Sequence, residues 1–282
     1  MLWLVYVGLC LFFSVSFTLI SRVSMSTTTK YTSAYTVLWE VLTGLMALPL
    51  LPFSSGNFHV DPRLAIVGIV SLILYTISNF FIFTAFKYEE ASVLSVILPI
   101  NNIFTFLATI LIFKAVFTNF TVAGIVLILL AILLSQFFQH TFRISKGSAY
   151  GLLFAAFIGL ALAFDAEVVK TFSVVTFIAA GFLVPAVLNQ FVFLRPSWHE
   201  LKYELTHQTF KLLLNAASQC LSTFFLYEAF TVGSTLQVVS VFALSTILTT
   251  LAGIIFLKER DHIPAKLASS VLATVGIILI NH

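Results

Sequence analysis

The segments TFLATILIFKA (Thr105–Ala115) and TTLAGIIFLKE (Thr249–Glu259) align without a gap and lie 144 residues apart. Thr, Leu, Ala, Ile and Lys recur at the same places in both. Chance matching between Leu- and Ile-rich segments would explain the apolar matches, but the lysine near the end of both runs favours duplication. The spacing therefore predicts an internal repeat.

The composition indicates that water is not the main solvent of this chain. Of its 282 residues, 60% are hydrophobic and 9% are charged, whereas about a quarter of the residues of a soluble domain are charged. A membrane-spanning helix needs about 20 mostly apolar residues. Ten such segments are predicted, at residues 2–21, 33–53, 63–86, 91–113, 119–138, 148–169, 174–194, 207–230, 234–257 and 264–281. The predicted fold class is an all-α integral membrane protein with ten transmembrane helices.

The ten segments divide into two units of five, residues 1–142 and residues 143–282. An odd number of spans in each unit makes the second copy cross the membrane in the opposite direction to the first. Such inverted repeats are typical of secondary transporters, which bind substrate at the interface between the halves. We therefore expect two inverted five-helix repeats.

Polar residues follow one face of the third and of the eighth predicted segment. Their relative positions are 0, 4, 7 and 8 in both segments, a spacing that stacks side chains on one side of a helix. The two sets, related by the 144-residue offset, are Ser71, Tyr75, Ser78 and Asn79, and Asn215, Gln219, Ser222 and Thr223. Residues of these types also hold transmembrane helices together by hydrogen bonds. Two symmetry-related stripes with Tyr, Asn and Gln favour a shared polar cavity, to which Asn102 of the fourth segment adds.

Glu40 lies inside the apolar run YTVLWEVLTGLMALPLL (Tyr35–Leu51). An ionisable residue at such a position indicates function. Three roles fit: a counter-ion for a cationic substrate, a proton carrier, or a hydrogen-bond acceptor for a neutral solute. Trp39 would add cation–π attraction if its ring faced the cavity. The alternative is a protonated Glu40 that is hydrogen-bonded to a neighbouring helix.

Asp165, near the end of the sixth segment, is the second candidate for proton coupling. Glu167 and Lys170 follow it closely, so mutual neutralisation near a helix end is an equally good interpretation.

No enzyme, metal site or cofactor is predicted. The six histidines have no metal-ligand spacing, and the sequence has no glycine-rich phosphate loop. The net charge of +3 is spread thinly, which argues against a nucleic-acid partner. Cys10 and Cys220 are expected to pack as small hydrophobic residues.

The segments AFKYEEASVLSVILPINNIFTFLATILIFK (residues 85–114), VAGIVLILLAILL (residues 122–134) and AFTVGSTLQVVSVFALSTILTTLAGIIFLKERD (residues 229–261) resemble EamA-type members of the drug/metabolite transporter superfamily. The resemblance covers essentially the whole chain. It implies ten helices, inverted five-helix repeats, alternating access and a central cavity. Family members export amino acids, drugs or other metabolites, and some relatives exchange sugars or nucleotide sugars. Many members have an arginine in the second span where this sequence has Trp39 and Glu40, which favours a cationic or zwitterionic substrate.

The resemblance and the charge distribution disagree on orientation. Eleven Lys and Arg residues lie in or beside the odd-numbered loops and three in the even-numbered loops. This bias puts both termini outside, whereas the resemblance implies that both are inside. The orientation therefore stays open.

The sequence thus predicts a secondary active transporter of the cell (plasma) membrane, a carrier or exporter of a small polar metabolite, an amino acid or a cationic or amphiphilic compound. The alternatives are a sugar or nucleotide-sugar exchanger and a non-transporting membrane scaffold subunit. The expected partners are the small-molecule substrate, a coupled proton and the lipid bilayer, and the chain is a monomer or a homodimer. The predicted substrate-binding residues are Glu40, Trp39, Tyr75, Asn79, Asn102, Asn215 and Gln219, with Glu40 and Asp165 as candidate proton-coupling residues.

Overall fold

The computed structural model describes residues 2–53, 62–113, 118–137, 145–168, 172–233, 238 and 241–280, with the side chains of residues 62–64, 106, 109–113, 135–137, 166 and 167 outside this description. The described elements are all helices. In chain order they are α1 (Leu2–Val23), η1 (Ser24–Thr28), α2 (Thr32–Ala47), η2 (Leu48–Phe53), α3 (Pro62–Tyr88), α4 (Ala91–Ile97), α5 (Ile100–Phe113), α6 (Asn119–Phe137), α7 (Lys146–Val168), α8 (Val174–Leu188), η3 (Asn189–Phe193), α9 (Trp198–Val232), α11 (Leu244–Phe256) and α12 (Ile263–Ile280). The predicted all-α class is confirmed.

Within the described residues, six helical stretches are long and apolar enough to cross a membrane: Leu2–Thr28, Thr32–Phe53, Ala65–Tyr88, Lys146–Asp165, Val174–Phe193 and Ile263–Ile280. Three shorter apolar helices span Ala91–Thr105, Asn119–Leu134 and Leu244–Phe256. The six longer stretches, the three shorter helices and α9 together provide a helix for each of the ten predicted segments.

The eighth segment differs from the prediction because its helix begins earlier, at Trp198. Ser197 caps this helix: its hydroxyl accepts from the Glu200 backbone N–H, and the Glu200 carboxylate accepts from the Ser197 backbone N–H. This reciprocal capping box stabilises a helix start. The helix bends at Gln208, whose φ is −132°. Residues from Trp198 to the bend at Gln208 are therefore helical and lead into the predicted eighth segment.

The fourth segment is broken between α4 and α5 at Leu98 and Pro99. Proline has no backbone N–H and clashes with the preceding helical turn, so the α-helical pattern ends before it. A tighter turn takes its place, in which the Asn102 N–H donates to the Pro99 carbonyl oxygen at 3.0 Å. In the ninth segment, Ala243 precedes α11 in the same way, and the Thr246 N–H donates to the Ala243 carbonyl oxygen at 3.2 Å.

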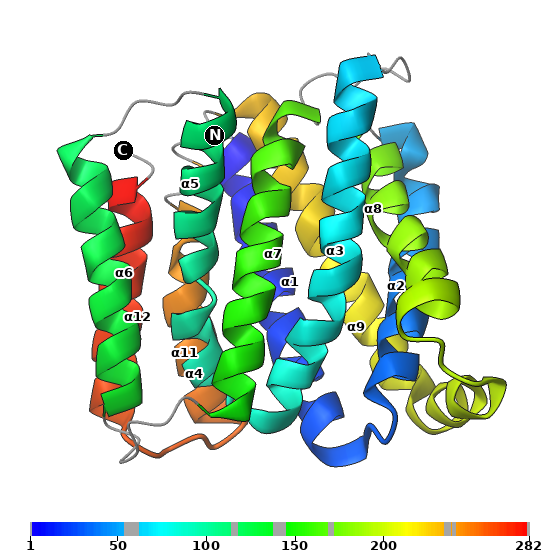
Figure 1. The fold of residues 1–282 in the computed structure, drawn as a ribbon. Helices are drawn as coiled ribbons and strands as arrows, with labels where there is room; N and C mark the ends of the chain where they lie inside the picture. The colour runs from blue at the N-terminus through cyan, green and yellow to red at the C-terminus, as the bar shows by residue number, and fades with distance from the viewer. Residues whose placement is uncertain are drawn as a thin grey trace.

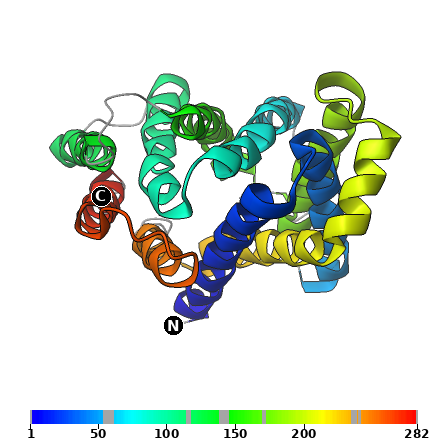
Figure 2. The same cartoon turned by 90° about the horizontal axis from the view of Figure 1, so that it is seen from below.

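The helices form one bundle in which elements far apart in sequence lie side by side. α1 packs along α9, and α3 packs along α7. The pair α6 and α12 forms one edge of the bundle and the pair α2 and α8 the opposite edge (Figures 1 and 2). The chain enters α1 and leaves α12 at the same face. At the other face, called the odd-loop face below, α1 and α3 end and α2, α4, α7 and α12 begin (Figure 1).

The pair α6 and α12 meets at two glycines. A Cβ atom on Gly124 would lie 2.6 Å from the carbonyl oxygen of Gly276, and one on Gly276 would lie 2.8 Å from that of Gly124. Glycines at both positions therefore let the two backbones come into contact, as small residues do where membrane helices pack.

Candidate functional site

Glu40 lies in the middle of α2, and its side chain is fully buried. Its Oε1 atom accepts hydrogen bonds from Nδ2 of Asn79 on α3 and from Nδ2 of Asn189 in η3, both at 2.9 Å. Its Oε2 atom also lies 3.1 Å from Nδ2 of Asn189, which donates in addition to the Thr76 carbonyl oxygen at 3.1 Å. Three helical segments therefore converge on one carboxylate.

A close approach of α2 and α8 brings Asn189 to this carboxylate. Gly44 lies one turn beyond Glu40 on α2, and a Cβ atom there would lie 2.6 Å from Cγ of Leu183. Glycine therefore leaves the space that Leu183 occupies. The π-helical turn Asn189–Phe193 follows α8, and π-helical turns are frequent at functional sites.

Trp39, which lies on α2 beside Glu40, packs in a cluster of aromatic side chains. Its ring centroid lies 4.8 Å from that of Phe83, 5.2 Å from that of Phe182 and 5.7 Å from that of Phe17. The residue is 3% exposed. Its indole Nε1 is buried and has no hydrogen-bond partner among the described residues. The cation–π role predicted for Trp39 stays a prediction.

Asp165, on α7, forms a second buried carboxylate site. It accepts hydrogen bonds from the hydroxyls of Ser71 and Tyr75 on α3 and from the Tyr227 hydroxyl on α9, the last at 3.3 Å. The Glu167 side chain and Lys170, whose charges offered mutual neutralisation as the alternative interpretation of Asp165, lie outside the described part of the chain. The contacts that are described are hydroxyl contacts to two other helices.

The polar stripe predicted on the third segment connects these two sites. Ser71, Tyr75 and Asn79 lie on successive turns of α3. The first two donate to Asp165 and the third donates to Glu40. The structure thus brings Tyr75 and Asn79 to one helix face, where they contact different acids.

The stripe on the eighth segment has other partners. The Asn215 amide donates to the Ser21 hydroxyl of α1 and to the Tyr35 hydroxyl of α2, both at 2.9 Å. Gln219 donates to the Thr223 hydroxyl of its own helix at 3.0 Å. Asn215 therefore joins α9 to α1 and α2, as a polar residue that packs membrane helices does.

Asn102 makes local contacts beside the break in the fourth segment. Its Nδ2 atom donates to Oδ1 of Asn101 at 2.8 Å and to the Pro99 carbonyl oxygen at 3.1 Å. Six of the seven predicted substrate residues thus fall into separate hydrogen-bonded groups: one around Glu40, one around Asp165, one around Asn215, and the local contacts of Asn102 and Gln219. Trp39, the seventh, lies in its aromatic cluster.

The sequence analysis missed two residues that contact the buried acids, Asn189 and Tyr227. Asn189 stands beside Gln190 inside the apolar seventh segment, and an intramembrane polar pair is the same kind of signal that marked Glu40. Tyr227 lies near the end of the eighth segment, outside its polar stripe. Only the tertiary structure, in which its hydroxyl lies 3.3 Å from Oδ2 of Asp165, gives it a role.

Within the described residues, no group of three or more His, Cys, Asp or Glu side chains could hold a metal ion. Cys10 and Cys220 are buried free thiols. The candidate site is therefore defined by Glu40 and Asp165 and by the amide and hydroxyl groups that contact them.

Comparison with known proteins identifies the family. In fold, the chain is similar to a solved structure titled only as the crystal structure of a protein, with a TM-score of 0.53 and 14% sequence identity over 96% of this chain and 97% of the other. A comparison with curated proteins finds no match. Residues 1–137 match the EamA-like transporter family, as the sequence resemblance implied. Residues 1–137 are therefore assigned to the EamA-like transporter family of the drug/metabolite transporter superfamily.

Proposed function

We propose that the chain is a secondary active transporter that carries a small cationic or zwitterionic solute, with Glu40 as its counter-ion. The observation that carries this proposal is a fully buried carboxylate whose described partners, Asn79 and Asn189, are neutral amides. Burial of an ionised carboxylate without a cation is costly. A substrate ammonium group would supply the missing positive charge.

The chemistry of the amides supports this assignment. A side-chain NH₂ group donates hydrogen bonds and cannot accept one. Asn79 and Asn189 therefore match the ionised form of Glu40, which accepts from both. Because Asn79 belongs to the first five-helix unit and Asn189 to the second, a solute that displaced them would alter contacts between the units.

We also propose that residues 1–142 and 143–282 are inverted repeats. Under the 144-residue offset, α1 corresponds to α7 and α3 to α9. The packing of α1 along α9 is then the counterpart of the packing of α7 along α3. The same offset relates Pro99 to Ala243, and a helix break occurs at both positions.

A pair of close contacts supports the same symmetry. A Cβ atom on Gly147 would lie 2.5 Å from Cβ of Glu89, and one on Gly233 would lie 2.9 Å from Cβ of Trp3. The offset relates Gly147 to Trp3 and Glu89 to Gly233. The same close contact between two helix ends thus occurs at both ends of the bundle. The glycine is Gly147, the equivalent of Trp3, in one contact and Gly233, the equivalent of Glu89, in the other.

Asp165 is proposed to carry the coupling proton. A hydroxyl both donates and accepts hydrogen bonds. Ser71, Tyr75 and Tyr227 can therefore donate to an ionised Asp165, and any of them can accept from the protonated form by rotating its hydroxyl. Loss or gain of a proton changes the bonds between α7, α3 and α9 without requiring a cation.

The proposed location is the plasma membrane, and the chain would act as a monomer or a homodimer. A sugar or nucleotide-sugar exchanger of the same superfamily and a non-transporting scaffold subunit are the competing functions. Neither accounts for a buried carboxylate that lacks a described cationic partner, so both serve as outcomes of the test below.

The test is a thermal-stabilisation screen of detergent-purified protein with amino acids, quaternary and aromatic amines, sugars and nucleotide sugars. A ligand at 100 times its Kd stabilises the folded state by about 2.7 kcal/mol. A cation or zwitterion should raise the melting temperature of the wild type and of the control Glu200→Gln, but not that of Glu40→Gln. Glu200 is a suitable control because its carboxylate caps α9 near the surface.

Three results would contradict the proposal. Equal stabilisation of Glu40→Gln would show that Glu40 is not the counter-ion. Stabilisation by sugars or nucleotide sugars alone would favour the exchanger. If no compound binds and reconstituted vesicles show no flux, the scaffold function is favoured instead.

A further inference from the structure

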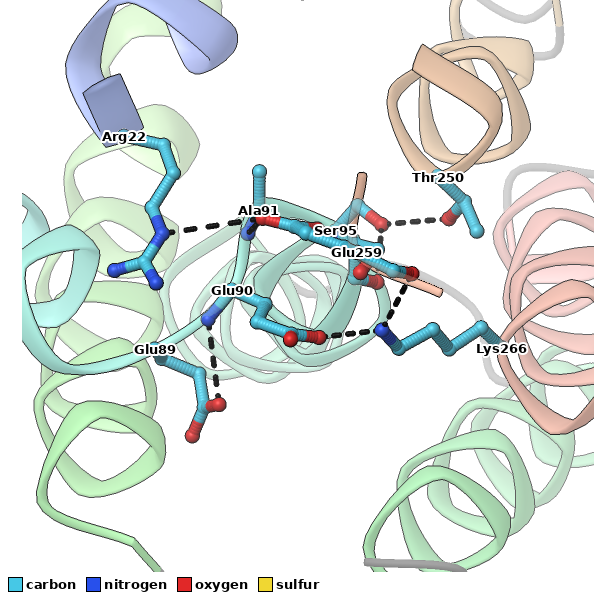
Figure 3. Close-up of polar contacts among 9 residues, drawn as sticks. Arg22, Glu89, Glu90, Ala91, Ser95, Thr250, Glu259 and Lys266 are labelled. Carbon is cyan, nitrogen blue, oxygen red and sulfur yellow. Dashed lines mark hydrogen bonds and ion pairs between the residues drawn. The ribbon is translucent and has the colours of Figure 1, made fainter. Parts of the chain in front are cut away.

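The Glu259 carboxylate, between α11 and α12, caps the start of α4 at the odd-loop face (Figure 3). Its Oε1 atom accepts from the Ala91 backbone N–H and its Oε2 atom from the Ser92 N–H, both at 2.9 Å. A Cβ atom on Gly253 would lie 2.7 Å from Oε2 of Glu259, so glycine leaves room for the carboxylate. Glu259 comes from the second five-helix unit and α4 from the first.

Two cations extend this contact. Nε of Arg22, at the end of α1, lies 3.8 Å from Oε1 of Glu259, and the same guanidinium donates to the Phe86 carbonyl oxygen at 2.7 Å. Lys266, at the start of α12, forms an ion pair with Glu90 and donates to the Glu259 carbonyl oxygen at 3.1 Å (Figure 3). We call Glu259, Arg22, Glu90 and Lys266 the Glu259 latch.

Two more carboxylates join the two units at the same face. The fully buried Glu204 of α9 accepts from the backbone N–H groups of Lys30 and Tyr31, at 2.8 and 2.7 Å, where α2 begins. Glu89, at the end of α3, accepts from the Ser148 hydroxyl of α7 at 2.9 Å. Charge-assisted hydrogen bonds of these kinds are about twice as strong as neutral ones.

The positions that the internal repeat relates to these residues carry no charge in the sequence. The 144-residue offset relates Arg22, Glu89, Glu90, Glu204, Glu259 and Lys266 to Ala166, Gly233, Ser234, Val60, Ala115 and Val122. The offset thus relates the charged residues of the odd-loop face to uncharged residues.

From these contacts between the two units we infer that the Glu259 latch holds the odd-loop face closed and that its release opens this face. The inference rests on the proposed alternating access of the two units. When the units separate at the odd-loop face, the Ala91 and Ser92 N–H groups leave the Glu259 carboxylate and water solvates both.

The test measures access to this face and needs no substrate. In a variant without Cys10 and Cys220, Ser95→Cys reports on α4 one turn inside the latch, because Ser95 is buried and contacts Thr250 at 2.8 Å. Val7→Cys, a buried position on α1 near the opposite face, is the second reporter. The rate of labelling by a polar maleimide is measured in detergent, with the melting temperature as a check on folding.

Glu259→Gln should raise the labelling rate of Ser95→Cys by about tenfold. The glutamine side chain can accept from only one of the two N–H groups, and the loss of a charged hydrogen bond shifts an equilibrium by roughly that factor. Glu200→Gln, which removes a carboxylate cap within one unit, should leave the rate unchanged. The labelling rate of Val7→Cys should not rise. An unchanged Ser95→Cys rate in folded Glu259→Gln overturns the inference, and so does an equal rise at both reporters, which indicates unfolding.

If Glu259→Gln does not fold, Lys266→Met serves instead, because it breaks the ion pair with Glu90 and leaves the capped N–H groups intact. A faster Ser95→Cys reaction then supports the latch, and an unchanged rate overturns it. Because access is read without a ligand, a failure here is distinct from a failure of Glu40 as the counter-ion.

Discussion

Glu40 and Asp165 are both buried carboxylates, yet their surroundings differ in a way that separates their proposed roles. Glu40 meets amide NH₂ groups, which only donate, and Asp165 meets hydroxyls, which donate and accept. The first arrangement suits a fixed negative charge and the second suits a group that changes its protonation. Asn79 and Tyr75 lie one turn apart on α3, so the two acids share one helix.

The Asn189 side chain should contribute more to stability than Asn79 or Asn102. It donates to both Glu40 oxygen atoms and to the Thr76 carbonyl oxygen, so Asn189→Ala removes the described donor to Oε2 of Glu40, while Asn79 still donates to Oε1. The expected loss is about 1–3 kcal/mol. Asn102→Ala, whose bonds are local and half-buried, is the matched control with a loss below about 0.5 kcal/mol. Thermal unfolding in detergent ranks the stability losses of the two variants. A loss for Asn102→Ala as large as that for Asn189→Ala would contradict the prediction.

At the scale of elements, the broken helix of the fourth segment shows how one residue shapes a span. Pro99 ends α4, and the chain resumes as α5 after a tight turn. The ninth segment has the same break at Ala243, without a proline. The break at Ala243 is therefore set by packing, whereas the one at Pro99 is also set by covalent geometry.

If the two breaks are equivalent, proline should be tolerated at position 243. Ala243 has a φ of −56°, which is within the range of proline. Ala243→Pro should therefore change the free energy of unfolding by less than about 1 kcal/mol, whereas Ala252→Pro in the interior of α11 should cost about 3 kcal/mol or more. Melting temperatures of the two variants test this, and equal losses would argue against the symmetry of the two spans.

At the scale of the whole molecule, two buried acids and one charged face are distributed over both proposed five-helix units, residues 1–142 and 143–282. Asn79 and Asn189 bring the two units to Glu40, and Ser71 and Tyr227 bring them to Asp165. The odd-loop face joins the same units through Glu259 and Glu204. A relative movement of the units would change all of these contacts together.

Asp165→Asn should uncouple transport from a proton gradient. In proteoliposomes, a pH gradient should drive accumulation of the solute by the wild type, while Asp165→Asn should exchange the solute without responding to the gradient. Tyr227→Phe, which removes one hydroxyl and keeps the acid, is the control and should stay coupled. Accumulation by Asp165→Asn that still follows the pH gradient would refute the assignment.

The apolar segments predicted the helices because each one is long enough and apolar enough to satisfy its backbone polar groups internally in lipid. The periodicity of Ser71, Tyr75 and Asn79 predicted their common face on α3, since this depends only on 3.6 residues per turn. The sequence alone identified Glu40 as a candidate functional residue, because a carboxylate is unusual within an apolar run.

The tertiary structure alone decided which partners these residues meet. Nothing local to α2 indicates that Asn189 approaches Glu40, since that contact depends on Gly44 and Leu183 letting α8 pack closely. Tyr75 and Asn79 contact different acids because α7 and α2 lie beside different turns of α3. The sequence by itself determined which residues lie on each helix face, because spacing along a helix is fixed by its geometry. Only the packing of the helices determined which faces meet, because that depends on contacts between residues distant in the chain.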